Sequence, residues 1–169
     1  MLTPRPLRLL ALFVPGLFFT FANAAPADDL DAVADRYLAA YTGQHLDELA
    51  TYYTPESVFD DPTSEGYWRQ RFRVTGGEQI VGAMRSGWTL LHGFNFEVEK
   101  RITYHDRVVL IGTSHLTLDG AMFGAKPGVD YTVALQAVTI LRIVDGKILE
   151  HLDHYDYAPL GVIAREARN

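Results

Sequence analysis

Hydrophobic residues recur every three or four positions in three stretches of the chain's first half. Residues 30–41, 46–53 and 77–91 each place their apolar side chains on one stripe, which predicts three amphipathic helices. Between the second and the third, Val58 and Phe59 predict a brief strand, and residues 63–75 predict a loop. This half of the protein is therefore expected to be mainly helical.

After Gly93 the hydrophobic period changes to two. The alternation predicts four long strands, over residues 94–104, 107–118, 131–144 and 147–157. Asp145-Gly146 predicts a tight hairpin turn between the last two. In the first of these strands, Ile102 and Tyr104 keep the parity of Phe94 and are expected on its face. Helices followed by hairpin-connected strands predict an α+β fold, with a curved antiparallel sheet packed on three helices.

The N-terminus has the composition of a signal peptide. Arg5 and Arg8 precede a short apolar run, and residues 22–24 have the small side chains of a cleavage site. A retained membrane anchor is the alternative, although the run is short for a transmembrane helix. We expect cleavage after Ala24, which removes residues 1–24 and makes the protein periplasmic or secreted.

The composition argues against several kinds of partner and chemistry. A formal net charge of −6, more negative still without the two leader arginines, argues against nucleic acid and anionic membrane surfaces as partners. The chain has no cysteine, so disulfides and thiolate metal ligands are unavailable. The length fits a single domain with its own core, expected over residues 25–157, followed by a surface tail over residues 158–169.

Asp61 is the strongest single candidate for acid–base chemistry. It follows Phe59 at the end of the short strand and precedes Pro62. If that strand borders a pocket, partial desolvation among aromatic residues makes the carboxylate a usable base. The alternative is structural, since Asp-Pro often starts a turn, and Asp60 could be the turn residue instead.

Aromatic residues offer both chemistry and binding surface. Tyr37 lies on the apolar stripe of the first helix, and its phenol could donate a hydrogen bond to a developing oxyanion. Alternatively, it is a core tyrosine whose hydroxyl binds the backbone. We count Phe59, Trp68 and Trp88 as candidate substrate-binding residues, with core packing as the alternative.

The last predicted strand has no uniformly apolar face. His151, Asp153 and Tyr155 alternate on one face together with Leu149, which indicates that a face lines a polar pocket or an interface. A His–Asp pair at this spacing could act as an acid–base couple, or it could offer two metal ligands with His115 as a third. A polar face in a dimer contact or in solvent is the other alternative. Nothing in the sequence brings His115 to the pair, so we expect no metal.

These segments resemble a known superfamily. Arg36-Tyr37, Asp61-Pro62 and Gly77-Glu78-Gln79-Ile80 are similar to motifs of the ketosteroid isomerases, which belong to the nuclear-transport-factor-2-like superfamily. The last strand, residues 150–156, is more similar to the SnoaL-like polyketide cyclases of that superfamily. The resemblance extends over residues 29–157. It implies a cone-shaped α+β barrel whose curved sheet encloses a cavity, usually in a homodimer.

The resemblance also implies roles for particular residues. By position, Asp61 matches the base of the isomerases and Tyr37 matches their oxyanion-binding tyrosine. Their protonated aspartic acid is not matched, because Thr139 stands at its position and donates a weaker hydrogen bond. Tyr155 fills a pocket position that is aromatic in the isomerases. The cyclases use a carboxylate of the last strand as acid–base group, so Asp153 competes with Asp61.

We therefore expect an exported protein that binds a small apolar carbonyl compound and isomerises or cyclises it without a metal or organic cofactor. Asp61 would take a proton next to the carbonyl, while Tyr37 and Thr139 would hold the enolate oxygen. His151 or Asp153 would relay a proton. The alternative is an exported, non-catalytic ligand-binding or dimerisation module of the same fold, which the unmatched third acid favours.

Overall fold

The computed structural model describes residues 27–167, so the predicted signal peptide, residues 1–24, lies outside the described part of the chain. The main elements are α1 (Ala27–Thr42), α2 (Leu46–Tyr52), β1 (Val58–Asp61), α3 (Ser64–Trp68), β2 (Phe72–Thr75), α4 (Gly77–Gly87), β3 (Leu91–Tyr104), β4 (Arg107–Asp119), β5 (Asp130–Val144), β6 (Lys147–Tyr155) and α5 (Ala158–Glu166). Two short 3-10 helices, η1 (Trp88–Leu90) and η2 (Gly120–Phe123), complete the order. Across this described range, the helices are too short or too polar to cross a membrane.

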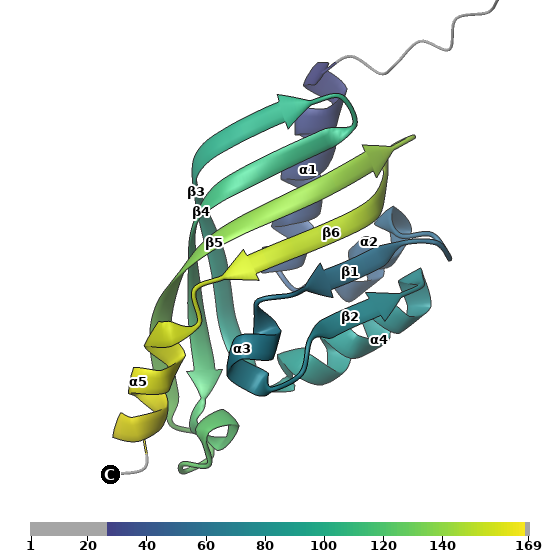
Figure 1. Cartoon of the computed structure of the whole chain (residues 1–169). Helices are drawn as coiled ribbons and strands as arrows, with labels where there is room; N and C mark the ends of the chain where they lie inside the picture. The colour runs from purple at the N-terminus through teal and green to yellow at the C-terminus, as the bar shows by residue number, and fades with distance from the viewer. Residues whose placement is uncertain (1–26, 168–169) are drawn as a thin grey trace, which may run out of the picture.

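The strands form one bent, unclosed sheet in the order β2-β1-β6-β5-β4-β3. Neighbouring strands are antiparallel except β1 and β6, which run parallel. Figure 1 shows α1, α2 and α4 on one face of the sheet, where α1 packs on β3, β4 and β5 and α4 packs on β1 and β2. The predicted cone-shaped α+β fold is confirmed.

The apolar stripe of α1 joins the helices to the sheet. Leu30, Ala34, Tyr37 and Tyr41 are buried at the helical spacing that the sequence predicted. They belong to one core cluster with apolar residues of α2, α4 and the inner sheet face, including Leu49, Ile80, Val108, Leu110 and Leu141. Since each large apolar side chain contributes about 1.5–3 kcal/mol on full burial, this contact fixes the position of α1 over the sheet.

A bulge in β3 reverses the predicted facing of that strand's second half. The pairing with β4 shifts register after Val98. Arg101 consequently turns toward α1 and forms an ion pair with Asp35. Ile102 and Tyr104 turn outward and are 45% and 70% exposed. Their predicted place on the inner face is wrong, because the extra residue of a bulge inverts the alternation beyond it.

A second irregularity lies in β6. Ile148 and Glu150 pair with consecutive residues of β5, so Leu149 is left over between them. Ile148 and His151 are therefore both buried on the inner face. The prediction that Leu149, rather than Ile148, shares the face of His151 is wrong for this reason.

The outer face of the sheet carries a continuous apolar row. Ile102, Val109, Ile140 and Leu152 are direct partners across β3, β4, β5 and β6. Figure 1 shows the helices of the described chain on the opposite face or at the lower end of the sheet, so none of them covers this row.

Two segments that the sequence predicted as irregular contain regular structure. Residues 63–75 form α3 and β2, and β2 pairs with β1 at the sheet edge. Elements of four or five residues are too short to show a clear hydrophobic period, which is why the sequence pattern missed them. The predicted surface tail instead forms α5, with Pro159 in its first turn.

Helix α5 closes one end of the cone. Leu160 is only 2% exposed and belongs to a second core cluster with residues of β4, η2 and β5, namely Leu118, Phe123, Val133 and Leu135. The C-terminal segment is therefore part of the core.

We expect Leu160→Ala to lower the free energy of unfolding by about 2–5 kcal/mol, because it leaves a cavity under α5. Urea denaturation measures this change. The control is Val162→Ala in the same helix, where the side chain is 44% exposed and the expected change is within about 0.5 kcal/mol. Equal effects of the two substitutions would contradict the packing of α5 on the sheet.

Candidate active site

A cavity of about 710 Å³ lies between the inner face of the sheet and helices α3 and α4. Its wall contains aromatic side chains, including Tyr41, Phe59, Phe72, Trp88, Tyr155 and Tyr157, and polar ones, including Ser64, Gln70, Arg71 and Arg73. Two carboxylates, those of Asp61 and Asp153, also line it. A cavity of this size that combines aromatic and polar side chains is typical of sites for small organic molecules.

The structure divides the residues predicted from the sequence into two groups. Those that line the cavity are Phe59, Asp61, Trp68, Trp88, Asp153 and Tyr155. Tyr37, Thr139 and His151 are buried and connect to Asp153 by hydrogen bonds or through one another. The structure therefore brings the predicted residues into one region, without testing their catalytic roles.

Asp153 is held by hydroxyl groups from three elements. Its Oδ1 accepts a hydrogen bond of 2.5 Å from Thr139, which lies directly opposite in β5. Its Oδ2 accepts longer hydrogen bonds, of 3.4 Å from Tyr41 and 3.3 Å from Tyr155. Since hydroxyl–carboxylate bonds are normally well under 3 Å, Oδ2 is only weakly bound and keeps capacity for a further partner.

A chain of buried polar groups continues behind Asp153. The His151 Nε2 lies 2.9 Å from the Asp153 Oδ1, an ion-pair distance, although its N–H is not directed along a hydrogen bond. The His151 Nδ1 lies 2.5 Å from the Tyr37 hydroxyl, which lies 2.5 Å from the Tyr53 hydroxyl. Nδ1 thus faces a phenol and Nε2 a carboxylate, so the ring bridges the Tyr37 hydroxyl and the Asp153 carboxylate.

The tyrosines around Asp153 remain protonated. Burial raises the pKa of Tyr37, Tyr41 and Tyr155 well above the usual range, and the negative charge of Asp153 raises it further. Their hydroxyls therefore act as hydrogen-bond donors to the carboxylate and the imidazole, and not as bases.

Asp61 lines the cavity, and each of its carboxylate oxygens also accepts hydrogen bonds that hold the local structure. Its Oδ1 accepts hydrogen bonds from the Thr63 backbone at 2.9 Å, the Thr63 hydroxyl at 2.6 Å and the Ser64 backbone at 3.1 Å. Its Oδ2 accepts a short hydrogen bond from Tyr157. These contacts fix the turn into α3, which is the structural alternative that the Asp-Pro sequence offered. A catalytic role for Asp61 stays a prediction.

The neighbouring Asp60 points to the other side of the strand. Its carboxylate binds Arg71 at 2.8 and 2.5 Å and Arg73 at 2.5 Å, and Arg73 lies directly opposite in β2. The hydrogen bonds from Arg71 are the main cause that lowers the pKa of Asp60. Parts of both arginines border the cavity, but Asp60 holds their guanidinium groups.

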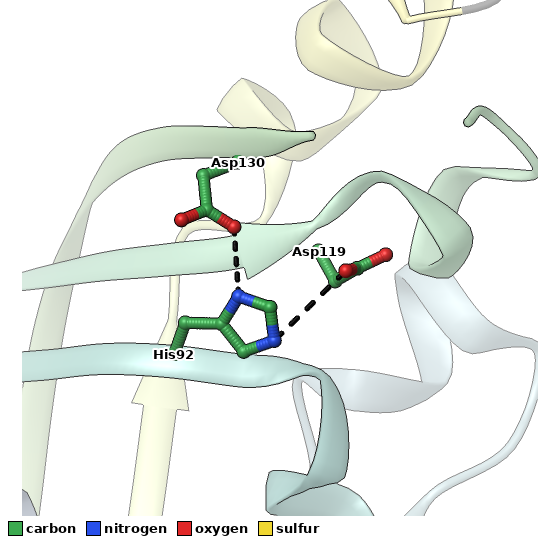
Figure 2. Close-up of side chains that lie close together, drawn as sticks. All are labelled: His92, Asp119 and Asp130. Atoms are coloured by element: carbon green, nitrogen blue, oxygen red, sulfur yellow. Dashed lines mark hydrogen bonds and ion pairs between the residues drawn. The ribbon is translucent and has the colours of Figure 1, made fainter. Parts of the chain in front are cut away.

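A second titratable cluster lies at the far end of the sheet. Figure 2 shows His92 between two carboxylates, with Nδ1 2.7 Å from Asp130 and Nε2 3.9 Å from Asp119. The ring directs a different nitrogen toward each carboxylate, and one ligand atom from each of the three residues lies within 4.8 Å of the other two, close enough to share a metal ion. Asp119 also accepts hydrogen bonds from the backbone of Ala121 and Gly128, which lower its pKa. The cluster bridges β3, β4 and β5.

The three metal ligands considered from the sequence, His115, His151 and Asp153, do not lie together. His115 is exposed on β4 and lies 3.4 Å from Glu97, whereas His151 and Asp153 are buried on the inner face.

Three residues of the site were missed from the sequence. Tyr41 could have been found, because it follows Tyr37 by one helical turn and shares its face. Tyr157 continues the parity of Tyr155 beyond the end of β6. Tyr53 carried no local signal, because only the packing of α2 brings its hydroxyl to Tyr37.

The family of the chain follows from a sequence comparison. The sequence profile of the SnoaL-like domain family matches residues 34–151. The chain belongs to the SnoaL-like domain family. None of the curated proteins matches this SnoaL-like protein significantly.

Solved structures share its fold. A structure assigned to a SnoaL-like polyketide cyclase from Shewanella putrefaciens is 29% identical with a TM-score of 0.71, over 79% of this chain and 94% of that one. A second structure, assigned to a SnoaL-like polyketide cyclase from Shewanella denitrificans, is 26% identical with a TM-score of 0.72, over 82% of this chain and 98% of that one. AclR from Streptomyces galilaeus, assigned as a hydroxylase, is 24% identical with a TM-score of 0.66, over 83% and 98%. This last likeness shows the fold alone.

We expect Tyr37→Phe to lower the free energy of unfolding by about 1–3 kcal/mol, because it removes a hydrogen-bond partner from both the His151 Nδ1 and the Tyr53 hydroxyl. Chemical denaturation measures the change. Tyr52→Phe is the matched control, since its ring also packs on Tyr37 but its hydroxyl makes no hydrogen bond in the described structure. If both substitutions cost the same, the buried chain contributes nothing to stability.

Proposed function

We propose that this SnoaL-like protein binds a small, largely apolar carbonyl compound in the aromatic cavity and transfers protons on it without a cofactor, with Asp153 as the acid–base group. The observation that carries the proposal is the position of Asp153. It is 1% exposed, it lines the cavity, and its Oδ2 is bound only by two long hydrogen bonds. A buried carboxylate with spare acceptor capacity is suited to removing a proton from a bound molecule.

The surrounding groups support this chemistry in different ways. Asp153 takes a proton from a carbon next to the carbonyl and returns it elsewhere on the same molecule, which is an isomerisation. In a ligand with a second carbonyl, the enolate carbon instead attacks that carbonyl carbon to close a ring, and Asp153 returns the proton to the new alkoxide. Once Asp153 has taken the proton, the hydroxyls of Tyr41 and Tyr155 are free to turn from its Oδ2 and donate to the enolate oxygen. Thr139 and His151 orient the carboxylate. Tyr37 is bound to Tyr53 and His151 and does not line the cavity, so we assign it a positioning role.

The main alternative is a non-catalytic protein that binds the same kind of molecule. Two observations favour it: both oxygens of Asp61 are committed to the turn before α3 and to Tyr157, and a threonine occupies the position of the isomerases' protonated acid. Both roles require a ligand in the same cavity.

We expect Asp153→Asn to lower proton-transfer activity by about 10²–10⁴-fold, because the amide cannot accept the proton. The assay incubates the protein with a Δ5-3-ketosteroid and with aromatic ketones in D₂O, following enone absorbance and deuterium incorporation by NMR. Asp61→Asn is the comparison. Loss of activity in Asp61→Asn alone, in a folded protein, would transfer the base role to Asp61. Binding of these ketones without any exchange would favour the non-catalytic alternative.

We further propose that the protein is a homodimer formed through the outer sheet face. The row of Ile102, Val109, Ile140 and Leu152 supplies an apolar centre. A two-fold axis through this row would bring the outer faces of two copies together and bury the apolar centre of both.

We expect Ile140→Glu to convert a dimer into a monomer, because it places an unpaired carboxylate in the apolar centre. Light scattering coupled to size exclusion gives the mass in solution. Val162→Glu adds the same charge on α5, away from the row, and should leave the dimer intact. A monomeric wild-type protein, or a dimeric Ile140→Glu variant, would contradict this interface.

Export is also part of the proposal, supported by the signal-peptide composition of residues 1–24. N-terminal sequencing of the protein from a periplasmic or culture fraction should begin at Ala25. An uncleaved N-terminus on cytoplasmic material would contradict export.

A further inference from the structure

The cavity contains two buried carboxylates that no lysine or arginine neutralises. Asp61 and Asp153 are 4% and 1% exposed, and both line the wall. Within residues 27–167, Asp61 has no ion-pair partner and Asp153 has only His151. A buried negative charge is costly unless a positive group or several strong donors compensate it.

The arginines nearest to the cavity do not supply this compensation. Arg71 and Arg73 both bind the carboxylate of Asp60, on the other side of β1. Phe59 on β1 and Phe72 on β2 instead face the cavity, with their ring centroids 5.6 Å apart. Arg71 and Arg73 also line the cavity, but their guanidinium groups are paired with Asp60 and form no ion pair with Asp61 or Asp153.

Among residues 27–167, His151 is the one group at ion-pair distance from Asp153, and its Nε2 makes no hydrogen bond there. Its Nδ1 lies 2.5 Å from the hydroxyl of Tyr37, and burial raises the pKa of this phenol, which therefore stays protonated. Asp61 differs from Asp153, because four donors already surround its oxygens. Asp153 is thus the carboxylate with an unfilled acceptor position at the cavity.

Aromatic rings gather beside that position. Tyr41 donates to the Asp153 Oδ2, and its ring centroid lies 5.7 Å from that of Trp88 and 6.1 Å from that of Phe59. All three rings line the cavity. The faces of tryptophan, tyrosine and phenylalanine carry negative charge density that attracts organic cations, most strongly when water is excluded.

We propose that the ligand of this cavity carries an organic ammonium group, held beside Asp153 and against the rings of Tyr41, Phe59 and Trp88. The cavity, at about 710 Å³, is much larger than a lone ammonium, so the rest of the ligand is the apolar part that fills the aromatic wall. The inference deepens the proposed function by naming a ligand class, and it rests on that proposal only for the place where the ligand binds.

The test compares two molecules of equal shape. Benzyltrimethylammonium and its neutral carbon isostere, neopentylbenzene, differ only in the charge of the central atom. Binding is followed by tryptophan fluorescence and by saturation-transfer NMR on the wild-type protein. We expect the cation to bind at least about tenfold more tightly, because the carboxylate attracts its charge and the rings contact its methyl groups. Equal binding, or preference for the isostere, overturns the proposal without any variant.

Variants then locate the cation. Asp153→Asn should reduce the affinity for the cation by about tenfold and leave the affinity for the isostere unchanged, because only the Coulomb attraction of the carboxylate is removed. Trp88→Leu should weaken cation binding a few-fold relative to the isostere. Asp47→Asn, which makes the same change in net charge at an exposed position of α2, should alter neither affinity. An effect of Asp61→Asn in place of Asp153→Asn would overturn the assignment to Asp153.

The test of the ligand class and the test of catalysis can fail independently of each other. A strong preference for the cation without proton transfer on any ketone contradicts catalysis and supports the ligand class. Proton transfer that requires Asp153, with no preference for the cation, overturns the ligand class and supports catalysis. If Asp153→Asn does not fold, the pair of probes on the wild-type protein still decides between a cationic and a neutral ligand.

Discussion

A carboxylate inside an apolar cavity needs donors on every side, and much of the inner face of this protein is arranged to give Asp153 such donors. Thr139 comes from β5, Tyr41 from α1 and Tyr155 from β6 itself. Tyr41 reaches the carboxylate only because α1 lies across the sheet at this point. The apolar stripe of α1 thus stabilises the fold and completes the polar site in the same contact.

The same alternation of strand faces separates positive from negative groups. Adjacent aspartates in β1 point to opposite sides, so Asp60 binds Arg71 and Arg73 outside while Asp61 lines the cavity. The guanidinium groups of both arginines are thereby paired with Asp60, and neither forms an ion pair with Asp61 or Asp153. This separation makes the interior aromatic and acidic, which disfavours anionic ligands and favours neutral or cationic ones.

Irregularities in two strands decide what faces the helices. The bulge in β6 places Ile148 and His151 on the same side, so an apolar anchor and the polar site share one short strand. The bulge in β3 turns Ile102 outward, where it completes the apolar row on the outer face. Both the cavity and the surface proposed for dimerisation therefore depend on a single extra residue in a strand.

The sequence by itself determined the type and order of the long elements, because hydrophobic period is a local property that α1, α4 and the four long strands all express. It also placed Asp153, His151 and Tyr155 on one face, and the motifs around Tyr37 and Asp61 indicated the family. Only the tertiary structure decided the bulges, the helical fold of the C-terminal segment and the contacts of Tyr37, Tyr53 and Tyr157. These depend on strand pairing and on packing between segments up to 114 residues apart, such as Tyr37 and His151. Local periodicity carries no information about such contacts, which is why the fold was predictable while the chemical partners within the site were not.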